Sequence, residues 1–213
     1  MNIIYFSGGP ARVNTYFVID DNSHCVIIDP SDNDIISDII NENHLIPLAV
    51  LLTHGHFDHI WALDDLLKSY PVPVYLHSDD ADKLTNNELN LSVRFGYDDP
   101  YKFKFNDPNL VNDGDDLTFS GMKFKVIHTP GHTAGCVCYL IDSFLFTGDT
   151  LFNLTVGRTD CYTADIAELK NSIEKLKKLD DNINIYPGHG NLSSIRFEKI
   201  YNPFMNGGFD QYE

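Results

Sequence analysis

The feature that most constrains this chain is a histidine-rich stretch that directly follows an apolar run. Residues 48–52 read Leu-Ala-Val-Leu-Leu, and such an unbroken run predicts a strand buried on both faces of a sheet. Residues 53–60 then read Thr-His-Gly-His-Phe-Asp-His-Ile. Because positions two apart point to different sides of a helix, His54 and His56 converge only if this stretch is a loop. The sequence therefore predicts a loop that gathers three imidazoles and one carboxylate at the end of a strand.

This set of side chains is typical of a metal site. Neutral imidazole and carboxylate bind zinc, and they also bind iron and manganese. The alternatives are a solvated polar loop or a tag-like tract, and the position inside the sequence at a strand end disfavours both. After the loop, apolar residues recur at helical spacing up to Pro71, namely Ile60, Leu63, Leu66 and Leu67. The expected order is strand, metal-binding loop and helix.

Hydrophobic periodicity divides the remaining sequence into two β-rich halves. The expected strands span residues 3–6, 15–19, 25–28, 72–76, 116–119, 122–127, 137–141, 144–146 and 182–186. The expected helices run through 35–40 after a cap at Ser31 or Asp32, from 78, through 164–179 and through 193–201. Strands followed by a helix, twice over, predict two sheets packed together with helices outside.

Residues 86–112 show no clear period but contain several aromatic residues, namely Phe95, Tyr97, Tyr101, Phe103 and Phe105. A long aperiodic segment is often a lid or a binding loop. The alternative, a loop packed on the core by its own aromatic residues, is equally compatible with the sequence.

Size and charge restrict the class of protein. A chain of 213 residues fits one domain with a sizeable core, so residues 1–213 are expected to form a single domain. The formal charge of −16 comes from 15 Lys and Arg against 31 Asp and Glu, which disfavours nucleic acid as a partner. The absence of an 18-residue apolar run or a signal-like N-terminus predicts a soluble protein without a membrane partner. Four cysteines without a Cys-x-x-Cys pair fit a reducing cytoplasm.

Three later segments repeat the arrangement of an apolar strand that ends in a glycine beside one candidate ligand. They are Thr129-Pro130-Gly131-His132, Thr147-Gly148-Asp149 and Pro187-Gly188-His189-Gly190. Each is weak alone, because a single histidine after a turn is usually structural and Asp149 could cap a turn. Together with the loop at 53–60, they predict a metal site shared by two sheets.

The complete set resembles the metallo-β-lactamase superfamily over essentially the whole chain and in the right order. The resemblance implies an α/β (α+β) fold: a single-domain αββα sandwich with two mixed β-sheets and helices on the outer faces. It implies two divalent metal ions, with zinc expected and iron or manganese as alternatives. His54, His56 and His132 would hold one ion, Asp58, His59 and His189 the second, and Asp149 would bridge them.

A hydroxide between the two ions would serve as the nucleophile, because paired cations lower the pKa of a shared water towards 7. Asp58 is the expected catalytic residue that orients it. Asp29 matches the position of a carboxylate that supports the ligands in this superfamily. Arg158 is either a substrate-positioning cation or the partner of an ion pair with Asp160. The other histidines, His24, His44, His77 and His128, are interpreted as non-ligands.

Within the superfamily, Asp149 argues against the main class of zinc β-lactamases, where a cysteine usually stands. The stretch 156–160, the turn 187–190 and the pattern Glu198-x-x-x-Asn202-Pro203-Phe204 are similar to the small bacterial glyoxalase II-like, or hydroxyacylglutathione hydrolase-like, enzymes. The resemblance implies hydrolysis of an acyl thioester, a small-molecule substrate.

Two departures from full-length glyoxalase II leave the thiol of the substrate open. Only 24 residues follow His189 (213 − 189), so no added C-terminal glutathione-binding helical domain is expected. Residues 161–164, Cys-Tyr-Thr-Ala, replace the family's usual aromatic-x-x-Gly.

Three readings remain at the level of sequence. The first is the thioester hydrolase. The second is a mononuclear iron persulfide dioxygenase that would use His54, His132 and Asp149, since an open-sided His₂-carboxylate site suits O₂ chemistry. The third is a metal-binding module without catalysis. The chain is expected to be a monomer or a homodimer.

Overall fold

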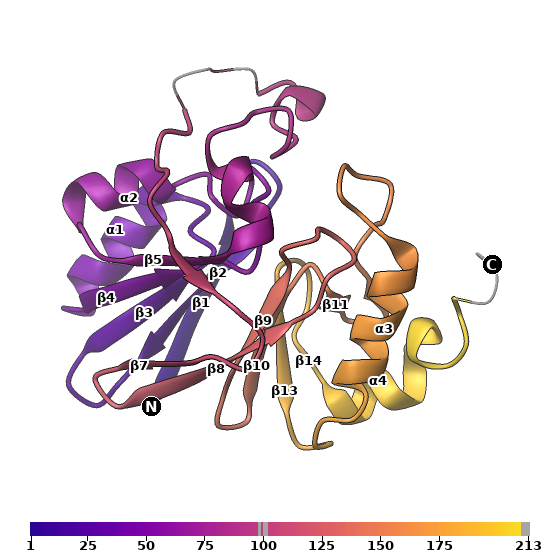
Figure 1. Cartoon of the computed structure of the whole chain (residues 1–213). Coiled ribbons are helices and arrows are strands. Elements are labelled where there is room, and N and C mark those ends of the chain that lie inside the picture. The colour runs from indigo at the N-terminus through magenta and orange to yellow at the C-terminus, as the bar shows by residue number, and fades with distance from the viewer. Residues whose placement is uncertain (98, 100–101, 210–213) are drawn as a thin grey trace. The chain divides into compact units, whose positions relative to one another are not determined.

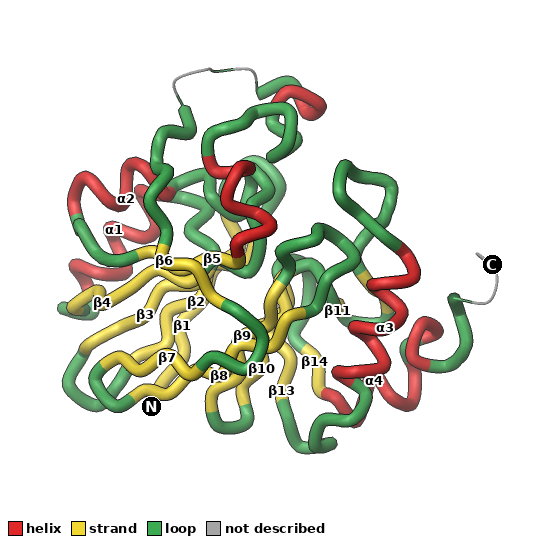
Figure 2. Tube along the Cα trace, viewed as in Figure 1, coloured by secondary structure: helices red, strands yellow, loops and turns green. Residues whose placement is uncertain are grey.

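The computed structural model describes residues 1–97, 99 and 102–209 (Figures 1 and 2). The chain divides into two compact units. The first comprises residues 1–111 and 118–123, and the second comprises 112–117 and the chain from 124 onward. The first unit contains one six-stranded sheet, and the second unit contains most of another.

The first sheet is mixed. Its strands lie side by side in chain order: β1 (Asn2–Gly8), β2 (Val13–Ile19), β3 (His24–Ile28), β4 (Ile46–Leu51), β5 (Val74–His77) and β6 (Asn109–Val111). The pairs up to β3 are antiparallel and the pairs from β3 to β6 are parallel. Two helices, α1 (Asn33–Glu42) and α2 (Leu63–Ser69), connect the parallel strands and contact each other (Figure 1).

The second sheet is also mixed. Its order is β14 (Ser193–Ser194), β13 (Asn184–Pro187), β10 (Phe144–Gly148), β9 (Val137–Ile141), β8 (Met122–His128) and β7 (Asp116–Phe119). Strands β10 and β13 are parallel, whereas β8, β9 and β10 form antiparallel pairs. A small hairpin of β11 (Leu151–Phe152) and β12 (Thr155–Val156) follows β10, and the helices are α3 (Ile166–Leu176) and α4 (Ile195–Tyr201).

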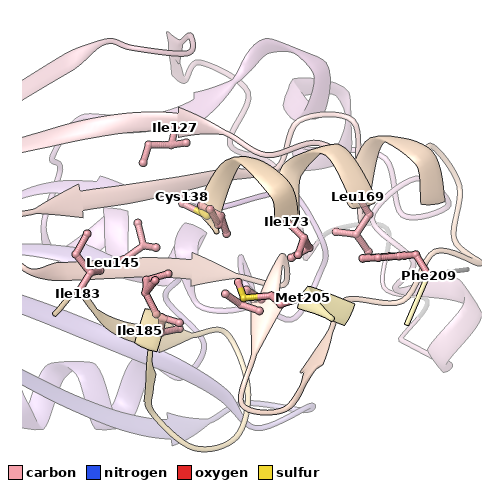
Figure 3. Packing of buried hydrophobic residues seen from close by; sticks show 12 residues of the cluster. Ile127, Cys138, Leu145, Leu169, Ile173, Ile183, Ile185, Met205 and Phe209 are labelled. Atoms are coloured by element: carbon pink, nitrogen blue, oxygen red, sulfur yellow. The ribbon is translucent and has the colours of Figure 1, made fainter. Parts of the chain in front are cut away.

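Helix α3 forms because its apolar residues recur on one face. Leu169, Ile173 and Leu176 are buried, and they join a cluster that includes Leu145 and Ile185 of the sheet. Figure 3 shows Leu169 and Ile173 pointing from α3 into this cluster. Burying each large aliphatic side chain contributes about 1.5–3 kcal/mol. The predicted apolar stripe of this helix is confirmed.

Aspartates begin both long helices. Asp32 accepts hydrogen bonds from the amides of Asp34 and Ile35 at the start of α1, at 3.2 and 3.3 Å. Asp165 does the same at α3. Of the two caps considered from sequence, Asp32 is therefore the one used. Ser31 is buried instead, and its hydroxyl lies 2.8 Å from that of Thr15.

Several expected boundaries shift. Strand β5 starts at Val74 rather than Val72, because Pro73 has no amide hydrogen to donate to a sheet. Residues 78–84 form a 3₁₀ helix, η1. The aperiodic segment 86–112 contains a short 3₁₀ helix, η2 (Val93–Phe95), and the edge strand β6; Tyr101 lies outside the described residues. A last 3₁₀ helix, η3, spans Pro203–Met205.

Two further findings concern the described residues as a whole. None of their helices combines the length and apolarity needed to cross a membrane. All four cysteines are free thiols. Burial raises the pKa values of Cys25 and Cys138 to about 12, so both are neutral core residues.

Candidate metal centre

The histidine-rich stretch is a loop, as predicted, between β4 and α2 of the first unit. Every residue from 51 to 60 is buried. A buried loop with this many polar groups is costly unless each group finds a hydrogen-bond or metal partner. The polar groups of the loop therefore need partners inside the protein, and neighbouring residues supply some of them.

The imidazoles of the loop lie close together. His54 Nε2 is 3.1 Å from His56 Nδ1, and the ring centroids of His54 and His59 are 4.1 Å apart. Zinc binds imidazole nitrogen at about 2.0–2.1 Å, so neighbouring ligand atoms of a tetrahedral site lie about 3.3 Å apart. The separation of His54 and His56 fits that requirement. Asp58 contributes a carboxylate oxygen 4.0 Å from His59 Nε2.

Asp29 fixes the orientation of the loop from the end of β3. It is 2% exposed. It accepts hydrogen bonds from the amide and the hydroxyl of Thr53, at 2.8 and 2.7 Å. His59 Nδ1 lies 2.8 Å from the same carboxylate. A carboxylate on Nδ1 fixes the tautomer of a histidine and directs Nε2 to a metal, which is the supporting role expected of Asp29.

A second buried carboxylate, which the sequence reading missed, holds the centre of the loop. The amide of Gly55 donates to Asp80 Oδ2 at 2.8 Å, and Lys83 Nζ lies 2.6 Å from Asp80 Oδ1. Both side chains are almost wholly buried. An aspartate and a lysine three residues apart are common on exposed helical turns, so the sequence carries no signal that this pair is internal.

The second unit gathers the other three candidate ligands at strand ends. Asp149 follows β10 directly, and His189 lies two residues beyond β13. Because these two strands are parallel neighbours, their carboxyl ends meet at one edge of the sheet. Asp149 Oδ2 lies 3.5 Å from His132 Nε2 and 3.6 Å from His189 Nε2. These separations also suit ligands of one cation.

Glycines allow close approach around this second set. A Cβ atom on Gly157 would lie 1.9 Å from the carbonyl oxygen of Asp149. Gly131 has a φ of +140°, and a Cβ atom there would lie 2.4 Å from the backbone of Leu169 in α3. Any larger residue at either position would displace the segment that carries a candidate ligand.

Arg158 contacts this set through its backbone. Its carbonyl oxygen lies 2.9 Å from His132 Nδ1, which leaves Nε2 of His132 available to a cation. Its guanidinium is exposed and forms a two-point ion pair with Asp160, at 2.5 and 2.6 Å, which raises the pKa of Arg158. The ion pair with Asp160, one of the two roles considered from sequence, is therefore present.

Comparison with known proteins extends these observations. Residues 8–189 match the family described as Metallo-beta-lactamase superfamily. The chain is 38% identical to an uncharacterized protein of Mycobacterium leprae, over 97% of this chain and all of the relative. It is 36% identical to a probable metallo-hydrolase of Bacillus subtilis, over 93% of this chain and 95% of the relative. A hydroxyacylglutathione hydrolase of Francisella tularensis subsp. novicida is 37% identical over 91% of this chain and 72% of the relative.

Solved structures agree with the sequence relatives. BLEG-1, a B3 metallo-beta-lactamase, has a TM-score of 0.92 at 36% identity and covers 97% of this chain and 100% of its own. TTHA1623 in a di-iron-bound form has a TM-score of 0.85 at 33% identity, over 94% and 99%. ETHE1 from Myxococcus xanthus has a TM-score of 0.77 at 28% identity, over 95% and 84%. The chain therefore belongs to the metallo-beta-lactamase superfamily and has its fold of two mixed sheets with helices.

Proposed function

We propose that this superfamily member is a metal-dependent hydrolase of acyl thioesters. The observation that carries the proposal is the buried loop 53–60, in which His54 and His56 have the nitrogen separation of ligands to one cation. Support for the substrate class comes from the similarity to a hydroxyacylglutathione hydrolase and to the motifs of the glyoxalase II-like branch.

The proposed site comprises the two sets of ligands acting together, with two divalent ions. The first set supplies three imidazoles and one carboxylate, and the second supplies two imidazoles and one carboxylate. The residues are His54, His56, Asp58, His59, His132, Asp149 and His189. Zinc is the proposed metal, because nitrogen and carboxylate ligands with open positions suit a catalytic zinc site; iron and manganese accept the same ligands.

Bound ions would supply a hydroxide nucleophile at neutral pH and would polarise the thioester carbonyl. The chain's own residues prepare this step. Asp58 would orient the nucleophile, while Asp29 and the Arg158 carbonyl fix the tautomers of His59 and His132. Attack on the carbonyl carbon then breaks the carbon–sulfur bond, and the sulfur leaves as a thiolate, which is a good leaving group.

Replacing Asp58 tests this mechanism. Asp58→Ala is expected to lower kcat by about 100-fold or more while the fold is retained, since the group that positions the nucleophile is lost. The measurement is steady-state turnover of a thioester panel with thiol detection, alongside circular dichroism. Asp21→Ala serves as the matched control, because Asp21 is an exposed carboxylate of the same unit.

Full activity of Asp58→Ala would contradict the mechanism. A β-lactam substrate belongs in the same panel, because BLEG-1 is described as a B3 metallo-beta-lactamase. Turnover of the β-lactam without turnover of any thioester would overturn the proposed substrate class.

A second candidate is an iron persulfide dioxygenase that uses His54, His132 and Asp149. The observation that bears on it is the di-iron-bound form of TTHA1623, which shows that a similar structure holds iron, although this candidate would use a single ion. Oxygen uptake by iron-loaded protein with glutathione persulfide would support this candidate, and its absence would dismiss it.

The proposal extends to the setting of the protein. The free cysteines fit a reducing cytoplasm. With a formal charge of −16, the expected partner is a small molecule rather than a nucleic acid or a membrane. The proposed assembly is a monomer or a homodimer.

A further inference from the structure

A hairpin of the second unit carries one candidate ligand and lies against two others. We call it the ligand hairpin; it comprises residues 149–158 and includes β11 and β12. Asp149, at its start, has Oδ2 3.5 Å from Nε2 of His132, and the carbonyl oxygen of Arg158, at its end, lies 2.9 Å from Nδ1 of the same ring. Asp149 Oδ2 is also 3.6 Å from His189 Nε2. The two arms of the ligand hairpin therefore face both nitrogens of one imidazole.

The two arms are in close contact beside His132. A Cβ atom on Gly157 would lie 1.9 Å from the carbonyl oxygen of Asp149 and 3.1 Å from Cβ of His132. The amide of Gly157 donates to the carbonyl of Thr150 at 3.4 Å. Because the arms pack this closely, a shift of one arm changes the position of Asp149 relative to the His132 ring.

The turn that joins the arms has an unfavourable backbone conformation. Leu154 has a φ of +65°, in the left-handed region that residues with a Cβ atom rarely adopt. Its side chain is 44% exposed, so burial of the leucine contributes little to holding the turn. The turn therefore needs contacts from another element.

Glu198 of α4 supplies these contacts. It is wholly buried, and its Oε2 accepts hydrogen bonds from the amide of Leu154 at 2.9 Å and from the side chain of Asn202 at 2.8 Å. Oε1 accepts a hydrogen bond from the hydroxyl of Ser193. The side chain of Asn202 also donates to the carbonyl of Thr155 at 3.1 Å. These bonds attach the turn of the ligand hairpin to the end of the chain that contains α4.

A carboxylate at this position needs an explanation, because burying its charge is costly. At Glu198 the hydrogen bonds from neutral donors offset that cost. An apolar side chain would be buried without the cost but would leave the amide of Leu154 without an acceptor. The spacing of Glu198 and Asn202, four residues apart, places both groups on the same face of α4, towards the turn.

We propose that Glu198 is a positioning residue of the candidate metal centre. It acts through the ligand hairpin: by fixing the turn, it sets where the Asp149 carboxylate and the Arg158 carbonyl stand against His132. The proposal rests on the proposed function, because it takes Asp149 and His132 to be metal ligands. It also gives a role to the pattern Glu198-x-x-x-Asn202, which the ligand set does not explain.

Three substitutions separate the position of the side chain from its charge. Glu198→Gln keeps the length of the side chain and an acceptor oxygen but removes the charge. Glu198→Asp keeps the charge, but its carboxylate is one methylene too short to reach the amide of Leu154. Glu198→Ala removes both. Because the proposed role is positional, we expect Glu198→Gln to resemble the wild type and the other two variants to share one defect.

Metal affinity reports the defect without turnover. Metal-free protein is titrated with Zn²⁺ in competition with a chromophoric chelator. We expect Glu198→Ala and Glu198→Asp to lower the zinc affinity about ten-fold and Glu198→Gln to lower it by less than about two-fold, since groups that support ligands have effects of this order. Co²⁺ is the second probe, because its visible absorption depends on coordination geometry. Its spectrum should change in Glu198→Ala and Glu198→Asp and not in Glu198→Gln.

The control for a general loss of stability is Ile195→Ala. Ile195 is buried in the same helix and belongs to the apolar cluster of the second unit. This variant should unfold at a lower urea concentration than the wild type. Its zinc affinity and its cobalt spectrum should nevertheless be those of the wild type.

Wild-type zinc affinity and cobalt spectra in Glu198→Ala and Glu198→Asp would overturn the proposal, because Glu198 would then only stabilise the fold. A defect in Glu198→Gln as large as that in Glu198→Asp would also overturn it, since the charge would then matter rather than the position. If Glu198→Ala does not fold, the comparison of Glu198→Gln with Glu198→Asp decides. Failure of the proposed function gives a different result: no thioester is hydrolysed, yet the order of zinc affinities persists.

Discussion

The ion pair of Asp80 and Lys83 holds the backbone of the candidate metal loop in place. The pair is buried, and Asp80 holds the amide of Gly55 between His54 and His56. Removing one member of a buried ion pair leaves a charge that neither water nor a counter-ion compensates, which costs about 3–5 kcal/mol. Removing one member of an exposed pair with the same spacing costs little free energy, because water already screens the two charges.

Lys83→Met is therefore expected to lower the free energy of unfolding by about 3–5 kcal/mol, as measured by urea denaturation. The chain contains a matched control in Lys68→Met, since Lys68 lies 2.7 Å from Asp65 with both side chains exposed. The double variant Asp80→Asn with Lys83→Met should recover part of the loss, because the asparagine remains an acceptor for Gly55. A loss in Lys83→Met no larger than in Lys68→Met would contradict this account.

At the scale of elements, the start of α3 connects a helix to a candidate ligand. Asp165 caps α3 by accepting hydrogen bonds from the amides of Ala167 and Glu168, at 2.8 and 3.0 Å. Its own amide donates to the carbonyl of Gly131, the residue before His132. The side chain of Asp165 thus stabilises the helix, while its backbone fixes the neighbouring turn.

Asp165→Ala should lower the free energy of unfolding by about 1 kcal/mol, the usual effect of losing an N-terminal cap. Asp165→Asn should lower the free energy of unfolding by only a small part of that amount, because asparagine also accepts hydrogen bonds from the first turn. Thermal or urea unfolding of the two variants measures the difference. Equal destabilisation by alanine and asparagine would show that the cap is not the source of the effect.

Elements whose apolar residues recur regularly over many positions could be predicted from the sequence, and the very short elements could not. The predictions of the strand before the loop and of the apolar stripe of α3 were confirmed, because burial imposes a repeat of apolar residues over many positions. The predicted loop after that strand was confirmed as well. Strands β6, β11, β12 and β14 have two or three residues, too few to establish a period. They form because the tertiary structure brings a partner strand alongside.

The candidate ligands were visible in the sequence because histidine and aspartate beside glycine at strand ends form an unusual pattern. The groups that support them were only partly visible. Asp29 was recognised through the resemblance to the superfamily, whereas Asp80 and Lys83 resemble an ordinary surface pair. The role of the Arg158 carbonyl could not be predicted, since any residue supplies a carbonyl group.

At the scale of the whole molecule, the chain carries its candidate ligands in two units with a formal charge of −16. Divalent ions would offset part of that negative charge and would bind only the folded chain, so they would also stabilise it. The thioester hydrolase and the iron dioxygenase differ in how many ions they need and in which metal.

Metal content therefore tests the central claim most directly. The measurement is elemental analysis of protein purified without added metal or chelator. The account predicts close to two zinc ions per chain, the stoichiometry of a two-metal hydrolase. A single iron ion per chain would contradict it and would favour the dioxygenase.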